Sequence, residues 1–503
     1  MPGELATREV GEPAADSPRY RRGPSGLLAW LLVAIAAVGL LAATPPSAGP
    51  DEPAHQVAAW YTSGHLLPPA PGQVFAVPDS LYVAACYAFH PDVTAACMPA
   101  RSDTGFWVTA STIVNYPPPY YWVVGTGERL AAVFGLQYAD IGGRLASLVL
   151  NLGVLLLLSL YMRRRHSGWG DILLLVSTPM AVFLGVVVNP SGWEVTCGIA
   201  FAVLLAEAAW AHRPSGSDDP SGSTLALLAV AGIGLCTARP ISFVWAAGLT
   251  AAALVLAPSM SRRTSLRVAF AVAPGILIGV IWALLHPDPL PVHSTVPTPT
   301  TIPNFANFFA ESLLWFPNRL HQMFGLLGWF DTPEPDLLVL ANIVAWTAVL
   351  TRLPNIRRTA ILGGVFGIVI LPSLIEALGW GVYPLWRQGR YTLPFALGFL
   401  VLLLLRSGRL IPRTISIASG VAVLSLGVMV WVNAARYDFG LNIFYLPANS
   451  RHQGLSPVQL DVALLAGALL VLISVVLLVR AWLNAPDDAR AAEPGRRPAA
   501  NGN

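Results

Sequence analysis

The sequence predicts an all-α polytopic membrane protein with about twelve transmembrane helices. Of its 503 residues, 55% are hydrophobic and only 11% are charged, and the mean hydropathy is +0.60. Apolar runs of the length that a spanning helix requires, about 20 residues, recur along the chain. A soluble globular fold has too little interior to bury so much apolar surface, so that class is excluded.

The first expected span is Gly26–Ala43. We interpret it as a retained anchor and not as a cleaved signal peptide, because no convincing small-x-small cleavage site accompanies it. The preceding Arg19, Arg21 and Arg22 place the N-terminal tail, residues 1–24, in the cytoplasm. The remaining spans are expected at 139–162, 170–188, 190–211, 224–238, 240–257, 266–285, 336–351, 359–379, 391–405, 414–432 and 459–480.

Arginine clusters set the direction of these spans. When the spans alternate, the clusters fall on the cytoplasmic side, as the positive-inside rule requires. The clusters lie within 163–165, 262–267, 352–358 and 406–413. The membrane domain then covers 25–480, both termini are cytoplasmic, and 481–503 is a disordered cytoplasmic tail. Every basic residue is arginine, whose codons are GC-rich, which indicates a bacterial plasma membrane. Short clusters between spans give no sign of nucleic-acid binding.

Two long loops are expected on the outer side. Residues 45–138 form the first, and its apolar stretch, 120–134, is too short and too interrupted to span, so we expect it along the outer surface. Residues 286–335 form the second, with a proline-rich start and an aromatic segment typical of an interfacial helix. Cys86 and Cys97 share the first loop, where an oxidising compartment permits a disulfide. Two unrelated free thiols are the alternative.

Asp51 and Glu52 form an acidic pair directly behind the first span. Such a pair can activate a hydroxyl, bind a divalent cation such as Mg²⁺ or Mn²⁺, or start a helix. The run Asp51-Glu52-Pro53 is also typical of a helix N-terminus, with aspartate at the cap and proline in the first turn. No Cys/His/Asp cluster with metal-ligand spacing surrounds His55, so no metal ligand is assigned and the cation stays open.

Other polar groups are expected on the same outer side. They are His55, Tyr116, Tyr120, Tyr121, Arg239, Arg387, Gln388, Arg390 and Tyr391. Sugar transfer from a lipid-linked phosphate requires a carboxylate that takes or orients the acceptor proton, and cations that hold the departing phosphate. The planar fork of arginine suits phosphate oxygens. The alternative is that the arginines bind lipid headgroups and the tyrosines belong to an interfacial aromatic belt.

Four motifs carry a resemblance that covers nearly the whole chain. They are Asp51-Glu52-Pro53-x-His55, Tyr116-Pro117-Pro118-x-Tyr120-Tyr121, Phe324-Gly325-x-x-Gly328-Trp329-x-Asp331-Thr332 and Gln388-Gly389-Arg390-Tyr391. In order and spacing they resemble the bacterial membrane proteins called domain of unknown function 2142. The arrangement of spans and the early acidic motif also resemble the GT-C superfamily of polytopic glycosyltransferases.

The resemblance to GT-C enzymes implies a polyprenyl-phosphate sugar donor, an inverting transfer on the extracytoplasmic side, and a cell-envelope glycan or lipid as acceptor. It implies that Asp51 is the catalytic base or orients the acceptor, with Glu52 as its partner through a hydrogen bond or a shared cation. Arg390 is the first choice for the donor phosphate, followed by Arg387 and Arg239. The three tyrosines of the second motif would line the sugar pocket, beside His55, Gln388 and Tyr391.

A transporter or flippase of a lipid-linked sugar or envelope precursor is the main alternative. An even number of spans with both termini inside is common among transporters. The long first loop and the lack of a visible internal repeat favour the enzyme.

Overall fold

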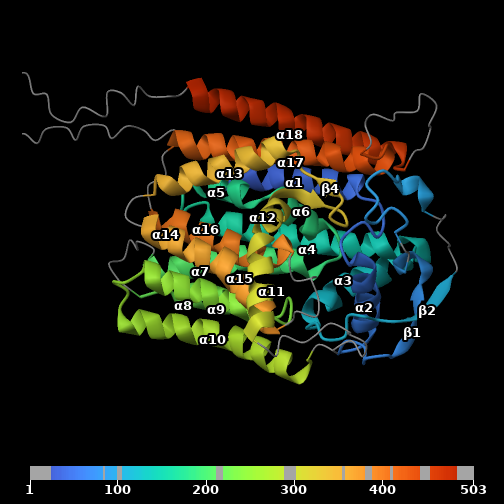
Figure 1. The fold of residues 1–503 in the computed structure, drawn as a ribbon, viewed down its shortest axis with the longest axis horizontal. Coiled ribbons are helices and arrows are strands. Elements are labelled where there is room, and N and C mark those ends of the chain that lie inside the picture. Colours follow the sequence, from blue (N-terminus) through green and yellow to red (C-terminus); the bar gives the residue numbers. More distant parts are fainter. Residues whose placement is uncertain are drawn as a thin grey trace, which may run out of the picture.

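The computed structural model describes residues 24–82, 85–98, 105–210, 219–287, 302–353, 357–379, 388–407, 412–441 and 454–483. These residues form mainly helices, most of which run side by side in one bundle (Figure 1). Two small two-stranded antiparallel sheets, which the all-α prediction did not include, complete the described part.

Within the described ranges, six helices are long and apolar enough to cross a membrane. They are α1 (Gly26–Ala43), α4 (Ala139–Met162), α7 (Pro190–Trp210), α10 (Arg262–Leu285), α17 (Pro412–Asp438) and α18 (Pro457–Leu483). A seventh span results if α5 (Trp169–Val176) and α6 (Pro179–Val186) count together, although they bend by 77° at their junction. The sequence predicted one continuous span there. Thr178 caps α6 from an extended conformation and Pro179 starts it, which ends α5.

The other predicted spans coincide with apolar helices of 10–17 residues. These are α8 (Gly222–Cys236), α9 (Ser242–Leu256), α13 (Asp336–Thr351), α16 (Leu393–Ser407) and the segment of α14 (Arg357–Gly364), a π-helical turn and α15 (Leu371–Gly379). Helix α16 lies in the core, with every residue from Leu393 to Leu405 buried. Every predicted span is therefore helical, while only the longer ones reach the usual length of a membrane crossing.

The ends of α4, α13 and α16 and the starts of α10 and α17 adjoin the arginine clusters in the sequence, and they lie at one end of the bundle, toward the left of Figure 1, which we name the basic end. There Arg165 pairs with Glu207 at 3.4 Å and Arg267 with Asp219 at 2.9 Å. Arg406 donates to the carbonyl of Leu256 at 2.9 Å. These contacts join the ends of helices that the sequence places on the cytoplasmic side. The opposite end carries the short motifs and is named the motif end.

The first outer loop packs on the motif end (Figure 1). It contains α2 (Glu52–Gly64), α3 (Pro119–Ala132) and the antiparallel strands β1 (Val74–Pro78) and β2 (Phe106–Ala110). Helix α3 is the apolar stretch that the sequence assigned to the outer surface, and it packs against α2 and α4. Gly127 of α3 lies against the Gly142 backbone, where an added Cβ would come within 2.6 Å of a carbonyl oxygen.

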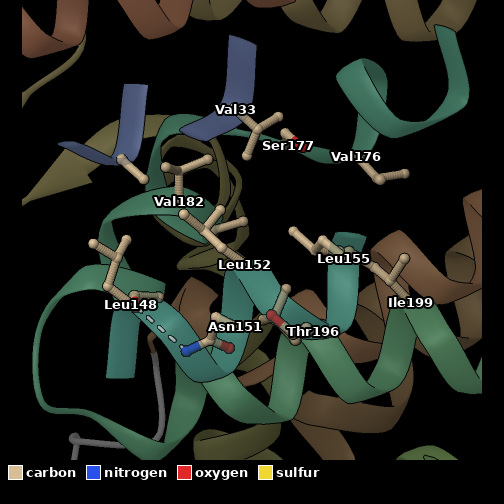
Figure 2. A pocket seen from close by; sticks show the side chains of 14 residues that line it. Val33, Leu148, Asn151, Leu152, Leu155, Val176, Ser177, Val182, Thr196 and Ile199 are labelled. Atoms are coloured by element: carbon tan, nitrogen blue, oxygen red, sulfur yellow. Dashed lines mark hydrogen bonds between the residues drawn. The ribbon is translucent and has the colours of Figure 1, made fainter. Parts of the chain in front are cut away.

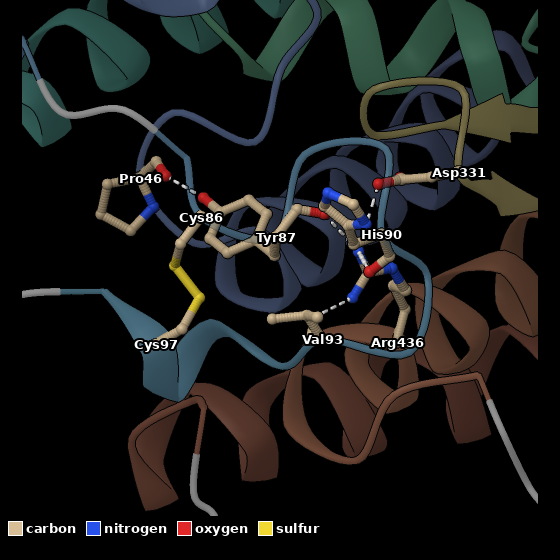
Figure 3. The surroundings of a disulfide bond; sticks show 8 residues. All are labelled: Pro46, Cys86, Tyr87, His90, Val93, Cys97, Asp331 and Arg436. Carbon is tan, nitrogen blue, oxygen red and sulfur yellow. Dashed lines mark hydrogen bonds and ion pairs between the residues drawn. A yellow bond between two sulfur atoms is a disulfide. The ribbon is translucent and has the colours of Figure 1, made fainter.

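A disulfide and an arginine fix the middle of this loop (Figure 3). The sulfur atoms of Cys86 and Cys97 are bonded, with a Cα–Cα distance of 6.1 Å. Tyr87 and His90 lie between the two cysteines in the sequence, and Arg436 of α17 donates to their carbonyls at 2.9 Å and 2.8 Å. Arg436 also pairs with Asp331 at 3.1 Å. A single buried guanidinium thus ties the loop to the bundle.

The second outer loop contains two helices and a two-stranded sheet, where one interfacial helix was predicted. It contains α11 (Ile302–Leu314), α12 (Phe316–Gly325), β3 (Leu326–Leu327) and β4 (Thr332–Pro333). Leu314, at the end of α11, is 81% exposed, whereas the second half of α12 packs on α6 and α13 and Met323 is only 2% exposed. Thr178, at the break between α5 and α6, donates to the Met323 carbonyl at 3.0 Å. This hydrogen bond joins the end of α12 to the break between α5 and α6.

Candidate functional site

The segment between α1 and α2 is held by hydrogen bonds to its carbonyl groups. Arg144 of α4 donates to the carbonyls of Thr44 at 2.6 Å and Pro45 at 2.7 Å. The indole of Trp329 donates to the Ser47 carbonyl at 2.9 Å, and Asn189 donates to the Pro50 carbonyl at 2.8 Å. Buried carbonyls outside regular structure need such partners. The segment that presents Asp51 is therefore fixed from three sides.

Asp51 has a left-handed backbone, with φ 61° and ψ 9°. A residue other than glycine in a sparsely populated region costs about 1–3 kcal/mol, and surrounding structure must impose it. Asp51 occupies the N-cap position of α2, yet its side chain makes no capping hydrogen bond. The simple helix-start interpretation therefore fails for the side chain. The carboxylate is turned toward another partner.

That partner is Arg390. Its Nη2 lies 2.5 Å from Oδ2 of Asp51, and the two side chains are 2% and 47% exposed respectively. Arg390 also donates to the Pro50 carbonyl at 3.3 Å and to the Tyr391 hydroxyl at 3.1 Å. Burial alone would raise the pKa of the Asp51 carboxyl, but the charge and hydrogen bond of Arg390 hold that pKa below its usual range. Asp51 is thus an ionised carboxylate with a face still accessible.

Helix α12 positions Arg390. The residue lies in a short 3₁₀ turn, Gly389–Tyr391, whose first backbone N–H donates to Oε1 of Gln322 at 2.7 Å. A Cβ added to Gly389 would lie 2.2 Å from the Arg319 carbonyl oxygen, so only glycine permits this approach. Gln388 precedes the turn in an extended conformation. Arg387, the neighbouring candidate, lies outside the described residues.

A second buried arginine, Arg239, lies beside the first. It is 5% exposed, and its guanidinium carbon is 4.0 Å from the centre of the Tyr391 ring. The Arg390 guanidinium is 5.0 Å from the same ring centre. Arg239 donates to the Tyr116 hydroxyl at 3.3 Å and lies 3.8 Å from Glu194. One tyrosine ring therefore contacts two guanidinium groups, which brings like charges together in a buried place.

His55 and Tyr121 complete this group. Nδ1 of His55 is 2.8 Å from the Tyr121 hydroxyl, and the His55 ring contacts Tyr116 edge-on with ring centres 5.5 Å apart. Burial and the nearby Arg390 and Arg239 lower the pKa of His55 to about 3, against the opposing effect of Asp51. His55 is therefore neutral at physiological pH and suits a hydrogen-bonding role.

Glu52 lies apart from this group, although it follows Asp51 directly. Its oxygens accept from Arg144 Nε at 2.8 Å and Nη2 at 2.6 Å. They also accept from the backbone N–H groups of Gly49 at 2.9 Å and Val188 at 3.0 Å. Glu52 is fully buried. The expected partnership with Asp51, through a hydrogen bond or a shared cation, is not what the structure contains, because Arg144 and the two backbone groups occupy both oxygens.

Tyr120 is also separate from the charged group. Its hydroxyl lies 3.1 Å from Ser147 Oγ of α4, and its side chain is 1% exposed. It packs with Val188 and with Ala58 and Ala59 of α2. Tyr120 therefore fastens α3 to α4, whereas Tyr116 and Tyr391 contact the guanidinium groups and Tyr121 contacts His55.

Several members of the site were not predicted from the sequence. Arg144, Asn189, Gln322 and Phe330, whose ring centre is 5.5 Å from the Arg390 guanidinium, received no role. Glu194, at the start of the predicted span 190–211, was not assigned a role either. It is fully buried and accepts from Ser242 at 2.6 Å. An ionisable residue inside an apolar segment is expected to have a partner. This rule could have identified both Glu194 and Arg144 from the sequence.

A cavity lies deeper in the bundle (Figure 2). It has a volume of about 30 Å³ and lies between α1, α4, α7 and the break between α5 and α6. Its lining is apolar except for Asn151, Ser177 and Thr196. Asn151 donates to the Gly185 carbonyl at 3.3 Å, in the segment that leads to Val188 and Asn189. Gly185 therefore links the cavity to Val188 and Asn189, which donate hydrogen bonds to Glu52 and to the Pro50 carbonyl.

The geometry suits an anion next to a nucleophilic hydroxyl. Arg239 and Arg390 supply positive charge in a place where water is largely excluded, and Asp51 is the accessible hydrogen-bond acceptor. Among the residues that the structure describes, no three His, Cys, Asp or Glu side chains come close enough together to hold a metal ion.

The fold and the site define a polytopic helical membrane protein whose charged motif residues converge at one end of the bundle. Residues 34–399 match the family described as predicted membrane protein (DUF2142), so the chain belongs to that family. No curated protein and no solved structure matches the chain.

Proposed function

We propose that the protein is a GT-C-type glycosyltransferase that moves a sugar from a polyprenyl-phosphate donor to an extracytoplasmic cell-envelope acceptor, either a glycan or a lipid. One observation carries this proposal. The half-exposed carboxylate of Asp51 lies 2.5 Å from the buried guanidinium of Arg390, and Arg239 shares the Tyr391 ring with that guanidinium. The proposed transfer requires a carboxylate that acts as a base and cations that hold the phosphate, and Asp51, Arg239 and Arg390 supply these groups.

The chemistry follows from these roles. When the donor phosphate binds between Arg239 and Arg390, it replaces Asp51 as the counter-ion and releases the carboxylate. Asp51 then orients the acceptor hydroxyl and takes its proton. The acceptor oxygen bonds to the anomeric carbon as the carbon–oxygen bond to phosphate breaks, and polyprenyl phosphate leaves with that electron pair. Attack opposite the leaving group inverts the anomeric configuration. The arginines stabilise the charge that develops on the phosphate.

The proposal includes the topology. About twelve crossings would place both termini in the cytoplasm and the motif end outside. The gathering of arginines at the basic end supports this orientation, and so does the Cys86–Cys97 disulfide in the first loop. Short helices such as α8 and α9 lie within the bundle between longer neighbours, which lets them cross without being long themselves.

Substitution of Asp51 by Asn tests the enzyme. In membranes supplied with a panel of polyprenyl-phosphate hexoses and pentoses, Asp51→Asn should lower the rate of glycan labelling by about 100-fold or more, because the amide cannot accept the proton. The matched control is Asp92→Asn in the same loop, an exposed carboxylate whose loss should leave the rate unchanged. Expression and size-exclusion behaviour are compared for both variants. A fully active Asp51→Asn protein would remove Asp51 as the base.

One observation favours a transporter or flippase of lipid-linked sugars instead. The 77° break between α5 and α6, with α12 contacting it from inside the bundle, resembles the discontinuous helices that form transport sites at the middle of a bilayer. Reconstitution in vesicles separates the two functions. A flippase moves the polyprenyl-phosphate sugar across the vesicle membrane without consuming it, whereas a transferase consumes it when an acceptor is present.

A further inference from the structure

A groove between α13 and α17 lies at the basic end, away from Asp51 and Arg390. It has a volume of about 440 Å³, and the two helices pack side by side (Figure 1). Helix α13 runs toward the basic end and finishes there, while α17 starts there. No part of the proposed transfer reaction uses this groove.

The walls of the groove follow helical periodicity. On α13 they are Ala341, Val344, Ala345, Ala348 and Arg352, and on α17 they are Arg413, Thr414, Ile417, Ala418 and Val421. Small residues form the floor, where Ala345 is 8% and Ala418 1% exposed, and larger ones form the rim, where Val344 is 57% and Ile417 37% exposed. Spacings of three and four place each set on one helical face. An apolar channel thus opens to the outside of the bundle.

The length of the channel matches half of a bilayer. From Ala341 to Arg352 the helix advances about 16 Å at 1.5 Å per residue. Half of the hydrocarbon core of a bilayer is about 15 Å. A channel that begins at a charged end and extends for this distance corresponds to one leaflet.

Two arginines stand at the mouth of the channel. Arg352 donates to the Thr414 hydroxyl, and Nε of Arg413 is buried without a hydrogen-bond partner. Among the described residues, no Asp or Glu forms an ion pair with either guanidinium. The first backbone N–H groups of α17 add positive potential beside them. The mouth therefore carries positive charge with unused donors.

We infer that this groove binds an anionic phospholipid, with its phosphate at Arg352 and Arg413 and one acyl chain along the floor of alanines. Basic pockets between membrane helices favour acidic headgroups, and guanidinium groups match phosphate oxygens. A free phosphate would use the mouth but not the channel. Because the groove combines a positively charged mouth with an apolar channel, its ligand is assigned as a lipid and not as free phosphate.

Native mass spectrometry of the full-length protein tests this inference. In detergent, phosphatidylglycerol should be retained at concentrations about 10-fold lower than phosphatidylcholine, a difference of about 1.4 kcal/mol. The variant R352Q/R413Q should lose that preference. The matched control R164Q/R262Q removes two exposed arginines elsewhere at the basic end and should keep it. Equal retention by R352Q/R413Q and the parent protein would overturn the inference.

A second pair of measurements separates the lipid from a soluble anion. Ala345→Phe fills the channel and leaves both arginines in place, so it should weaken phosphatidylglycerol binding while the protein remains monodisperse. Inorganic phosphate at the concentration of the lipid should not displace it, because phosphate cannot occupy the channel. Displacement by phosphate, or unchanged lipid binding in Ala345→Phe, would show that the channel plays no part.

Discussion

At the scale of single residues, two adjacent carboxylates have different partners and different roles. Successive side chains on a helix point about 100° apart, and Asp51 is in addition left-handed. Glu52 is therefore directed into the bundle toward Arg144, and Asp51 toward Arg390. The sequence predicted that this pair matters and that Arg390 accompanies Asp51. The sequence could not separate the two roles. The left-handed conformation of Asp51 depends on side chains of α4 and of residues far along the chain, which donate hydrogen bonds to the carbonyls of the preceding segment.

Glu52→Gln should destabilise the protein far more than Asp51→Asn. Removing one partner of a fully buried ion pair leaves an unpaired charge and costs about 3–5 kcal/mol, and Arg144 and Glu52 are 3% and 0% exposed. The control Glu207→Gln breaks the Arg165 pair, whose arginine is 48% exposed, and should cost less than about 1 kcal/mol. In thermal unfolding in detergent, the Glu52→Gln variant should therefore have a lower midpoint temperature than the Glu207→Gln variant. A Glu52→Gln midpoint equal to that of Glu207→Gln would contradict the structural role.

At the scale of elements, apolar runs and proline or arginine boundaries predicted where the apolar helices lie, and six of these helices are long enough to be candidate spans among the described residues. The sequence pattern did not reveal the break between α5 and α6 or the entry of α12 into the bundle. Both depend on pairing between distant segments, as when Thr178 donates to the Met323 carbonyl. The aromatic residues of 305–329 suggested an interface, whereas Gln322 of α12 faces the protein and accepts from the backbone N–H of Gly389.

Gly389→Ala tests whether α12 positions the 3₁₀ turn that carries Arg390. The added Cβ would lie 2.2 Å from the Arg319 carbonyl oxygen, so the turn must move and take Arg390 away from Asp51. We expect the transfer rate to fall by about 100-fold, in line with misplacement of a catalytic group by about 1 Å. The control Gly153→Ala, where nothing lies within 4 Å of the added Cβ, should leave the rate unchanged. Normal transfer in Gly389→Ala would show that the packing of the turn does not position the site.

At the scale of the whole molecule, two ends of opposite character follow from the distribution of charge. Arginines at the basic end pair with carboxylates or carbonyls near the surface, or line the α13–α17 groove. At the motif end, Arg239 and Arg390 are buried against the Tyr391 ring, and Arg390 pairs with Asp51. The positive-inside pattern predicted which segments share an end, because loop charge is local information. The depth at which charged side chains are buried is a property of the packed bundle.

Thiol labelling tests the orientation of these ends. The free cysteines among the described residues, Cys197 and Cys236, are buried, and Cys86 and Cys97 are bonded to each other, so the background is low. Thr112→Cys replaces an exposed residue of the first outer loop at the motif end, and Ser223→Cys an exposed residue at the basic end. A membrane-impermeant maleimide applied to intact cells should label the former and not the latter, and permeabilised cells should show both. Labelling of Ser223→Cys alone would place Asp51 in the cytoplasm, where an extracytoplasmic acceptor has no access to it.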